Sequence, residues 1–333
     1  MIALWITMGL VALVALAVFI AAVVCHVRMF RSPPRHMPKA GAYDLPEGEE
    51  YRPFYNDMRA WTDMIRAYPY KRYEILSHDG LTLRAKFFEY KPGAPIELMF
   101  HGYKGHAERD LSGGVERCFR LGHSTLLIDH RGSGYSDGSI LTFGILEKRD
   151  CRAWIDFAIR EFGEDAKLIL TGISMGAATV MMAAGEPASG EPAAGSPAAG
   201  EALPPQIQYV LADCGYTSPR EIISKVMRDM KLPPALLYPC ATLGARLFGG
   251  FDLNEYSPME AMATCRVPIV FAHGDADGFV PCDMSVRLYE ACASEKKKLV
   301  IIPGAGHGLA FPVGRDEYVN ALAEFKRECG FDF

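Results

Sequence analysis

The sequence has no excess of charge of one sign. Its 35 basic and 40 acidic residues give a formal net charge of -5 and a pI of about 6.0. A broad positive surface of the kind that binds nucleic acid is therefore not expected. Half of the residues are apolar and 23% are charged. A chain of this composition can bury a sizeable core, which excludes a disordered tail or a collagen-like fibre.

Paired cysteines are also missing. The nine cysteines are scattered through 333 residues without a Cys-x-x-Cys pair or the Cys/His spacing of a zinc site. An odd number of scattered cysteines favours free thiols in a reducing compartment. We therefore expect neither a disulfide framework nor a metal, and we expect no cofactor.

The start of the chain lacks charged residues. Residues 2–25 contain no Asp, Glu, Lys or Arg, and as a helix they would extend roughly 36 Å, enough to cross the hydrocarbon core of a bilayer. This predicts a transmembrane anchor over residues 1–27, with residues 2–25 in contact with the membrane. A cleaved signal peptide is the alternative, but such a peptide begins with basic residues, and this chain begins MIALW.

Basic residues follow the apolar stretch. Arg28, Arg31, Arg35 and Lys39 lie on one side of it, and only the amino terminus lies on the other. The positive-inside rule then predicts a single-pass N-terminal anchor with the folded domain in the cytoplasm.

The rest of the chain divides into a linker and one large domain. Residues 28–50 are rich in Pro, Gly and charge, which is typical of a linker, and the folded domain is expected over residues 51–333. Residues 186–200 read EPASGEPAAGSPAAG, a repeat that cannot bury enough surface to fold, so we expect a disordered insertion without a role in chemistry. Residues 219–264 are much longer than a crossover needs and should contain extra helices.

Hydrophobic patterning predicts the class of the domain. Two alternating runs joined by Asp79-Gly80 indicate an antiparallel hairpin. Short continuous apolar runs then alternate with helical stretches, as buried parallel strands require. These runs cover residues 96–100, 125–128, 167–170, 209–212, 268–272 and 299–302. The pattern predicts an α/β fold with a mostly parallel, doubly wound sheet.

A nucleophilic serine is indicated by the pattern G-x-S-x-G, which occurs around both Ser174 and Ser136. Ser174 directly follows an apolar strand and is followed by the small residues of a helix start. A sharp strand-to-helix turn needs such small residues, because larger side chains would collide with the strained backbone. Ser136 lies several residues past its strand, in a glycine-rich turn. We therefore assign Ser174 as the nucleophile.

The acid and the base that such a serine needs occur downstream, in the order Ser, Asp, His. The strand at 268–272 runs into HGDADGFVP, which contains Asp275 and Asp277, and the strand at 299–302 is followed by GAGHG, which contains His307. Each lies just past the carboxyl end of a strand, where side chains gather in open α/β sheets. Asp277 is preferred as the acid, because Asp275 is placed to bond nearby backbone amides as turn aspartates do.

Backbone donors for an oxyanion are expected at two amides. One is the N–H of Met175, directly after the nucleophile, and the other is the N–H of Tyr103 in the turn that follows the strand at 96–100. His101, in the same FHGYKG segment, is interpreted as a hydrogen-bonded structural residue.

In their order along the chain, these motifs resemble those of the α/β-hydrolase fold serine hydrolases. The resemblance covers about residues 72–328 and includes the loop DHRGSGYS after Leu127 and Ile128. The chain is most similar to bacterial membrane-anchored hydrolases of the serine aminopeptidase/monoacylglycerol lipase-like group. The resemblance implies Ser174 as nucleophile, Asp277 as acid, His307 as base and residues 219–264 as a small helical lid.

A carboxylic ester hydrolase of the EC 3.1.1 class, acting on a small-molecule ester or acyl substrate, is the first functional hypothesis. Aminopeptidase, amidase or thioesterase activity on the same triad is the alternative, because only the leaving-group pocket differs. A non-catalytic binding protein is a third hypothesis, and the complete set of catalytic residues argues against it.

Overall fold

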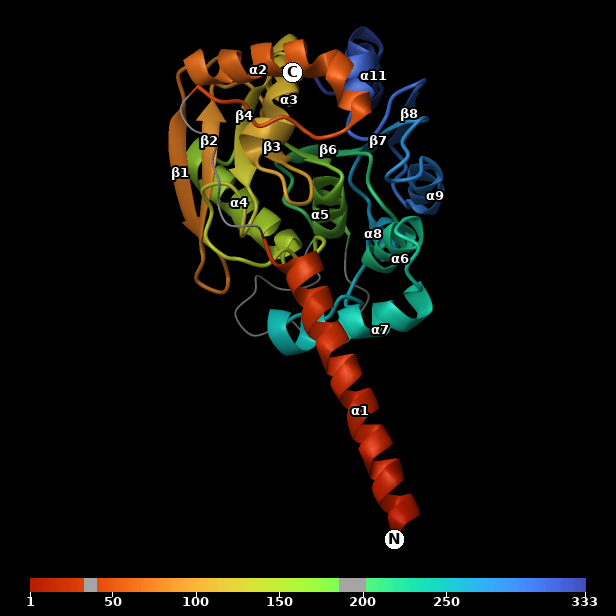
Figure 1. Ribbon diagram of the computed structural model, residues 1–333. Coiled ribbons are helices and arrows are strands. Elements are labelled where there is room, and N and C mark those ends of the chain that lie inside the picture. Colours follow the sequence, from red (N-terminus) through yellow and green to blue (C-terminus); the bar gives the residue numbers. More distant parts are fainter. Residues whose placement is uncertain (33–40, 186–201) are drawn as a thin grey trace.

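The computed structural model describes residues 1–32, 41–185 and 202–333. The predicted repeat insertion at 186–200 and part of the predicted linker lie outside the described residues. Figure 1 shows one α/β domain with a long N-terminal helix, α1, projecting from it.

Eight strands form one sheet in the order β1-β2-β4-β3-β5-β6-β7-β8. Only β2 runs antiparallel to its neighbours β1 and β4, and the remaining pairs are parallel. The strands are β1 Lys71–Leu76, β2 Thr82–Phe88, β3 Ile96–Phe100, β4 Ser124–Asp129, β5 Leu168–Ile173, β6 Ile207–Asp213, β7 Ile269–Gly274 and β8 Lys297–Ile302. The predicted hairpin and the predicted mostly parallel sheet are thus confirmed.

Helices cover both faces of the sheet, which explains why the central strands are apolar without alternation. Leu98 and Leu170 point into one cluster, while their neighbours Met99 and Ile169 belong to clusters on the other face. The first face is covered by α4 Glu147–Phe162, α5 Met175–Ala184, α8 Pro258–Thr264 and α9 Asp283–Ala291. The second is covered by α3 Ala107–Arg120, α10 Ala310–Val313 and α11 Arg315–Cys329, with α2 Tyr55–Ala67 packed on α3.

The segment predicted as a lid, residues 219–264, contains two helices besides α8. These are α6 Pro219–Asp229 and α7 Pro234–Gly244, and α7 continues into one π-helical turn, Ala245–Gly249. Helix α6 begins where Ser218 caps the backbone N–H of Glu221 and Pro219 occupies the first turn.

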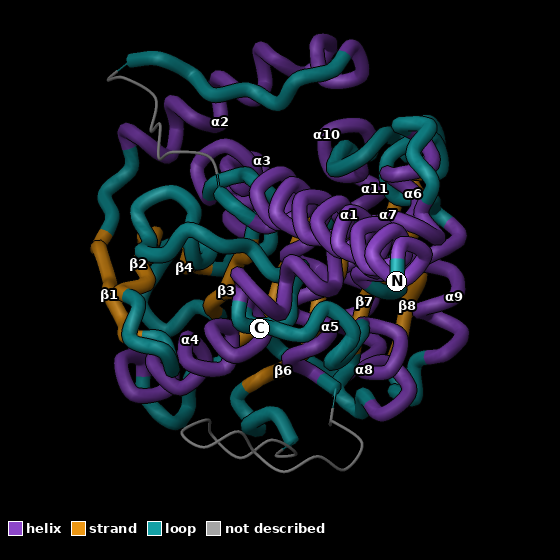
Figure 2. The backbone as a smooth tube through the Cα atoms, turned by 60° about the horizontal axis from the view of Figure 1, so that its bottom comes forward, coloured by secondary structure: helices purple, strands orange, loops and turns teal. Residues whose placement is uncertain are grey.

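Helix α1, Ile2–Cys25, continues as a π-helical turn, His26–Phe30, and packs against α7. Figures 1 and 2 both place α7 across the end of α1 that adjoins the domain. By length and composition, residues Ile2–Phe30 could cross a membrane, although a signal sequence also has these properties.

The described parts of the predicted linker contact the domain. Phe30 is fully buried, and the next residue, Arg31, forms an isolated bridge with Ile140. On the far side of the gap, Asp44 lies 2.9 Å from the ring of His106. The chain between α1 and the domain is therefore held at both of its described ends.

Candidate active site

Ser174 occupies the sharp turn between β5 and α5. Its φ of 55° and ψ of −114° are strained for a residue with a side chain. The strain is accommodated by close backbone packing: a Cβ on Gly172 would lie 2.1 Å from the carbonyl oxygen of Gly176, and a Cβ on Gly176 would lie 2.0 Å from that of Phe100. The two glycines of G-x-S-x-G are thus required by contact.

A chain of hydrogen bonds links Ser174, His307 and Asp277. The Oγ of Ser174 lies 3.0 Å from Nε2 of His307, and Nδ1 of His307 lies 2.7 Å from Oδ2 of Asp277. Since an ionised carboxylate only accepts, Nδ1 carries the proton and Nε2 is free to accept the serine hydroxyl proton. The three residues come from loops after β5, β7 and β8, whose carboxyl ends lie at one edge of the sheet.

The carboxylate of Asp277 is held in the loop after β7. Its Oδ1 accepts the backbone N–H groups of Phe279 and Val280, both at 2.8 Å. Its Oδ2 also lies 3.1 Å from Nε2 of the buried His273. Burial raises the pKa of Asp277, but the hydrogen bonds from His273 and His307 outweigh it and hold the pKa well below its usual range. The acid therefore stays ionised beside the imidazole.

The alternative candidates lie elsewhere. Asp275 accepts the backbone N–H of Gly304 at 2.6 Å and is exposed. Ser136 is buried and donates its hydroxyl to the carbonyl of Asp129 at 2.6 Å. Asp275 thus bonds to a backbone amide of the loop after β8 and not of its own turn, and Ser136 bonds within the loop after β4.

Of the two predicted oxyanion donors, Met175 directly follows Ser174 and Tyr103 lines the same cleft as Ser174. Met175 is the first residue of α5, where a backbone N–H has no acceptor within the helix. Tyr103 lies in the turn after β3, which is fixed by a hydrogen bond from the N–H of Gly102 to Asp110 at 3.1 Å. His101 is fully buried: its Nδ1 lies 2.8 Å from the carbonyl of Gly102 in this turn, and its Nε2 accepts the N–H of His130, in the loop after β4, at 3.0 Å.

A cleft of about 410 Å³ opens beside Ser174 and His307, large enough for a small ligand. Its roof comes from residues that the sequence analysis did not single out, among them Pro46, Glu47 and Tyr51. Among the described residues that line it, none belongs to the segment 219–264. The aromatic run at 51–55 was the available signal for this roof, but nothing in the sequence says which face of the domain it covers.

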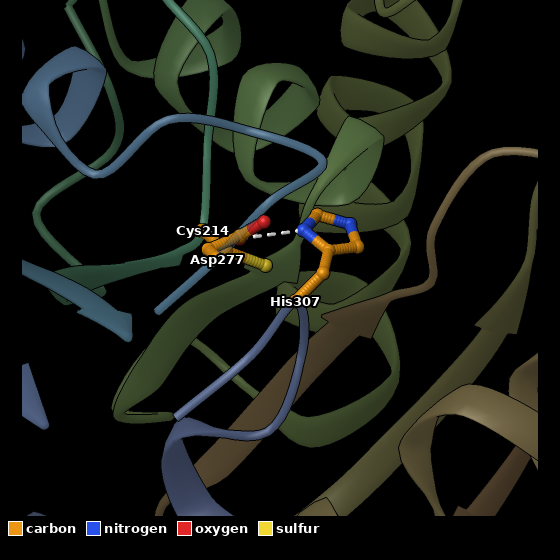
Figure 3. Close-up of side chains that lie close together, drawn as sticks. All are labelled: Cys214, Asp277 and His307. Atoms are coloured by element: carbon orange, nitrogen blue, oxygen red, sulfur yellow. Dashed lines mark hydrogen bonds and ion pairs between the residues drawn. The ribbon is translucent and has the colours of Figure 1, made fainter. Parts of the chain in front are cut away.

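Cys214 is a neighbour of Asp277 and His307 that no sequence pattern indicated. Figure 3 shows its sulfur beside the Asp277 carboxylate and the His307 ring, and donor atoms of the three lie within 4.8 Å of one another. Burial raises the pKa of the Cys214 thiol well above its usual range, and the carboxylates of Asp213 and Asp277 add to this shift. A metal at this place would require the thiolate form of Cys214 and would take Asp277 and His307 as its other protein ligands. The donor set therefore fits a packed thiol better than a resident metal.

Comparison with known sequences gives one family. A model of the alpha/beta hydrolase family matches residues 98–322. The chain is 27% identical to the protein YqkD of Bacillus subtilis over 206 residues, which are 62% of either chain. It is 23% identical to the protein bem46 of Schizosaccharomyces pombe over 266 residues, 78% of this chain and 77% of that protein. The match thus spans less than two thirds of the length of YqkD.

Solved structures share the fold. The Pyrococcus furiosus esterase Pf2001 superposes with a TM-score of 0.63 and 20% identity, covering 90% of this chain and 98% of that one. Est1E of Butyrivibrio proteoclasticus, solved with ferulic acid bound, gives a TM-score of 0.54 and 21% identity, covering 78% and 98%. At these identities the likeness establishes the architecture.

Proposed function

This chain belongs to the alpha/beta hydrolase family, and from that premise we propose that it is a serine hydrolase that cleaves carboxylic esters through an acyl-enzyme on Ser174. The observation that carries the proposal is the hydrogen-bond chain from Ser174 through His307 to Asp277. The structural likeness to the Pyrococcus furiosus esterase Pf2001 agrees with an ester substrate.

In this proposal, each step of the reaction is assigned to one or more of the three residues. The Oγ of Ser174 attacks the ester carbonyl carbon while Nε2 of His307 takes the hydroxyl proton. The tetrahedral intermediate collapses, its C–O bond breaks, and His307 gives the proton to the departing alcohol. Water then attacks the acyl-enzyme, His307 takes its proton, and the carboxylic acid leaves as the proton returns to Ser174. Asp277 holds the imidazole in the productive tautomer throughout.

The oxyanion that forms in both halves of the reaction would be bound by the amides of Met175 and Tyr103. Each preorganised backbone donor of this kind stabilises the transition state by about 3 kcal/mol. Because these donors are backbone groups, a side-chain substitution cannot remove them directly and can act only on the turn that positions the Tyr103 amide. That turn is held by Asp110, which accepts the N–H of Gly102.

We further propose that α1 is a retained membrane anchor. Ala22 and Phe30 are fully buried against the domain, and a Cβ on Gly244 would lie 2.4 Å from the carbonyl oxygen of Ala22. If α1 were removed as a signal peptide, the α7 surface that Ala22 covers would be exposed. The basic residues after α1 support an orientation with the domain in the cytoplasm.

Labelling with a fluorophosphonate probe tests the nucleophile. The Ser174→Ala variant should lose labelling and lose roughly 10⁴- to 10⁶-fold in turnover. The matched control is Ser136→Ala, at the second G-x-S-x-G, which should still be labelled. A panel of p-nitrophenyl esters beside aminoacyl amides and thioesters then separates esterase from aminopeptidase and thioesterase activity. Labelling that survives in Ser174→Ala would contradict the proposal.

A further inference from the structure

Helix α7 is apolar on every side although it lies at the surface. Residues 232–245 contain no charged side chain. In water, a helix without a polar face is normally buried. Here one side packs on α1 and another remains open: Leu236 is 66% exposed, and Met230 and Leu247, which flank α7 in the chain, are 63% and 57% exposed.

The side of α7 that is covered is covered by α1. The backbone of Ala22 packs directly on Gly244. Just beyond α7, the ring of Phe248 lies 5.9 Å from that of Phe19 and 5.6 Å from that of His26. The open apolar surface, formed by Met230, Leu232, Leu236, Leu247 and Phe248, is therefore continuous with the apolar surface of α1. We call these five side chains the α7 patch.

The position of α7 along α1 matches the edge of a bilayer. Residues 2–20 are all exposed; near the end of this stretch the ring of Phe19 contacts that of Phe248, and burial against the domain begins at Ala21. At 1.5 Å per residue, this free stretch is roughly 28 Å long, close to the thickness of about 30 Å of a hydrocarbon core. Figure 1 shows α7 lying across α1 at the end of this free stretch. With α1 spanning a membrane, α7 lies at the boundary between hydrocarbon and headgroups.

Exposed basic side chains lie beside the α7 patch in the sequence and just after α1. Arg28, Arg228, Lys231 and Arg246 are exposed, and Arg246 also pairs with Asp252 at 2.7 Å. An apolar surface bordered by Lys and Arg is typical of helices that lie in the interface of a bilayer with anionic lipids.

We propose that the α7 patch is embedded in the membrane interface and that the substrates are amphiphilic esters drawn from that bilayer. The second part rests on the proposed esterase function. The occupant of the patch is the lipid surface into which α1 inserts, because the two apolar surfaces are continuous.

Both walls of the catalytic cleft are attached to this membrane-facing region. On one wall, Lys104 donates to the carbonyl of Arg28 at 2.7 Å, and the hydroxyl of Tyr103 donates to the carbonyl of Met29. On the other, Lys225 of α6 donates to the carbonyl of Gly278. The next residue, Phe279, has its ring 5.0 Å from that of His307. Residues that line the cleft, or adjoin a lining residue in the chain, are therefore bonded directly to the segment that follows α1 and to α6, the helix that precedes α7.

Fluorescence quenching in the full-length protein tests the lipid contact. In a Trp5→Phe background reconstituted in nanodiscs, the Leu236→Trp variant is compared in lipids with and without bromine on the upper acyl chain. We expect the added fluorescence to fall by at least about a third, because interfacial helices bury their apolar face about 5–10 Å deep. The control is Tyr90→Trp, 43% exposed just after β2 and thus at the opposite edge of the sheet. Equal quenching at the two positions would overturn the proposal.

Hydrolysis by Leu236→Glu tests the substrate class. Position 236 lies in the first turn of α7, where a glutamate suits the helix dipole, so the fold should be kept. In nanodiscs, we expect the rate on a long-chain monoacylglycerol in the bilayer to fall about fivefold or more and the rate on soluble p-nitrophenyl butyrate to stay within about twofold. Tyr90→Glu should change neither rate. Equal loss on both esters, or no loss on the monoacylglycerol, would overturn the substrate assignment.

Together, the two experiments distinguish failure of the membrane contact of the α7 patch from failure of the proposed esterase function. If the wild-type protein hydrolyses neither ester while Leu236→Trp is quenched, the esterase function and the substrate assignment fail together and the membrane contact of the α7 patch stands. If both esters are hydrolysed while Leu236→Trp is not quenched, the esterase function stands and the membrane contact fails.

Discussion

Oδ2 of Asp277 lies 2.7 Å from Nδ1 of His307, so one carboxylate oxygen contacts the imidazole. Replacement by asparagine removes the negative charge that selects the Nδ1–H tautomer. We therefore expect Asp277→Asn to lower kcat by about 10⁴ with little change in KM. The measurement is steady-state hydrolysis of one p-nitrophenyl ester by purified protein whose folding is checked by circular dichroism.

Asp275 provides the matched control for this prediction, because it is two residues away and its carboxylate bonds only to the loop at Gly304. Asp275→Asn should cost mainly stability and reduce activity modestly. If Asp275→Asn were the inactive variant instead, the acid of the triad would be misassigned by two residues.

His273 is expected to act as a positioning residue for Asp277. Its Nε2 lies 3.1 Å from Oδ2 of Asp277 and 2.9 Å from the carbonyl of Val280, while Nδ1 lies 2.6 Å from Oγ of Ser285. His273→Phe should lower kcat roughly 10- to 100-fold, as loss of one hydrogen bond to a charged group does. KM should change little. Ser285→Ala, which leaves the bond to Asp277 in place, should retain most of the activity, and equal losses in the two variants would contradict this role.

Acid should destabilise the domain through two buried imidazoles. Burial lowers the pKa of His130 to about 4 and holds that of His101 well below its usual range. In an unfolded chain, both would titrate near pH 6.5. Below that pH the unfolded state takes up protons that the folded state does not, so the free energy of unfolding should fall by about 1.4 kcal/mol per pH unit for each histidine.

Urea denaturation in detergent at pH 7.5 and at pH 5 measures this effect. Between about pH 6.5 and pH 5, the loss due to His130 alone should be about 2 kcal/mol. His130→Asn lowers stability at both values but should show a smaller pH dependence than the wild type. An unchanged pH dependence in the variant would mean that other groups cause the acid sensitivity.

The orientation of the anchor is tested by reporters fused after Phe333. We expect green fluorescent protein to fluoresce and alkaline phosphatase to be inactive in a bacterial host, because the basic residues after α1 keep the domain in the cytoplasm. Both fusions should remain in the membrane fraction. An active phosphatase fusion would reverse the orientation without affecting the catalytic assignments.

The sheet and the candidate triad could be predicted because their signals are local. The apolar strands and the glycine pattern around Ser174 are each recognisable within a few residues of sequence, although Gly176 is also required by a contact with the distant Phe100. Likewise, the turns that carry Asp277 and His307 immediately follow strands, so the parallel sheet brings them to one edge. The preference for Asp277 over Asp275 rested on the same local reasoning, and the observed hydrogen bonds agree with it.

Contacts between distant segments could not be predicted in this way. The cleft is roofed from Pro46, Glu47 and Tyr51, and α7 holds the end of α1. The roof belongs partly to a segment whose composition is typical of a linker, and an apolar stretch such as 232–245 suits a buried helix as well as a membrane surface. His273 and Cys214 were also missed, because neither has a sequence pattern that distinguishes a residue beside a triad from one in the core.

The junction between α1 and the domain determines how far the domain can move from the membrane. A tether of n flexible residues lets a domain range over roughly 5–6 Å × √n. Here Phe30 is buried within the domain and Arg31 bridges to Ile140, so the domain begins where the helix ends. With α1 in a bilayer, Ser174 stays at a fixed height above the membrane and moves only by lateral diffusion. The encounter with substrate then becomes a search in two dimensions, and its rate depends on the surface density of the substrate and not on its concentration in bulk water.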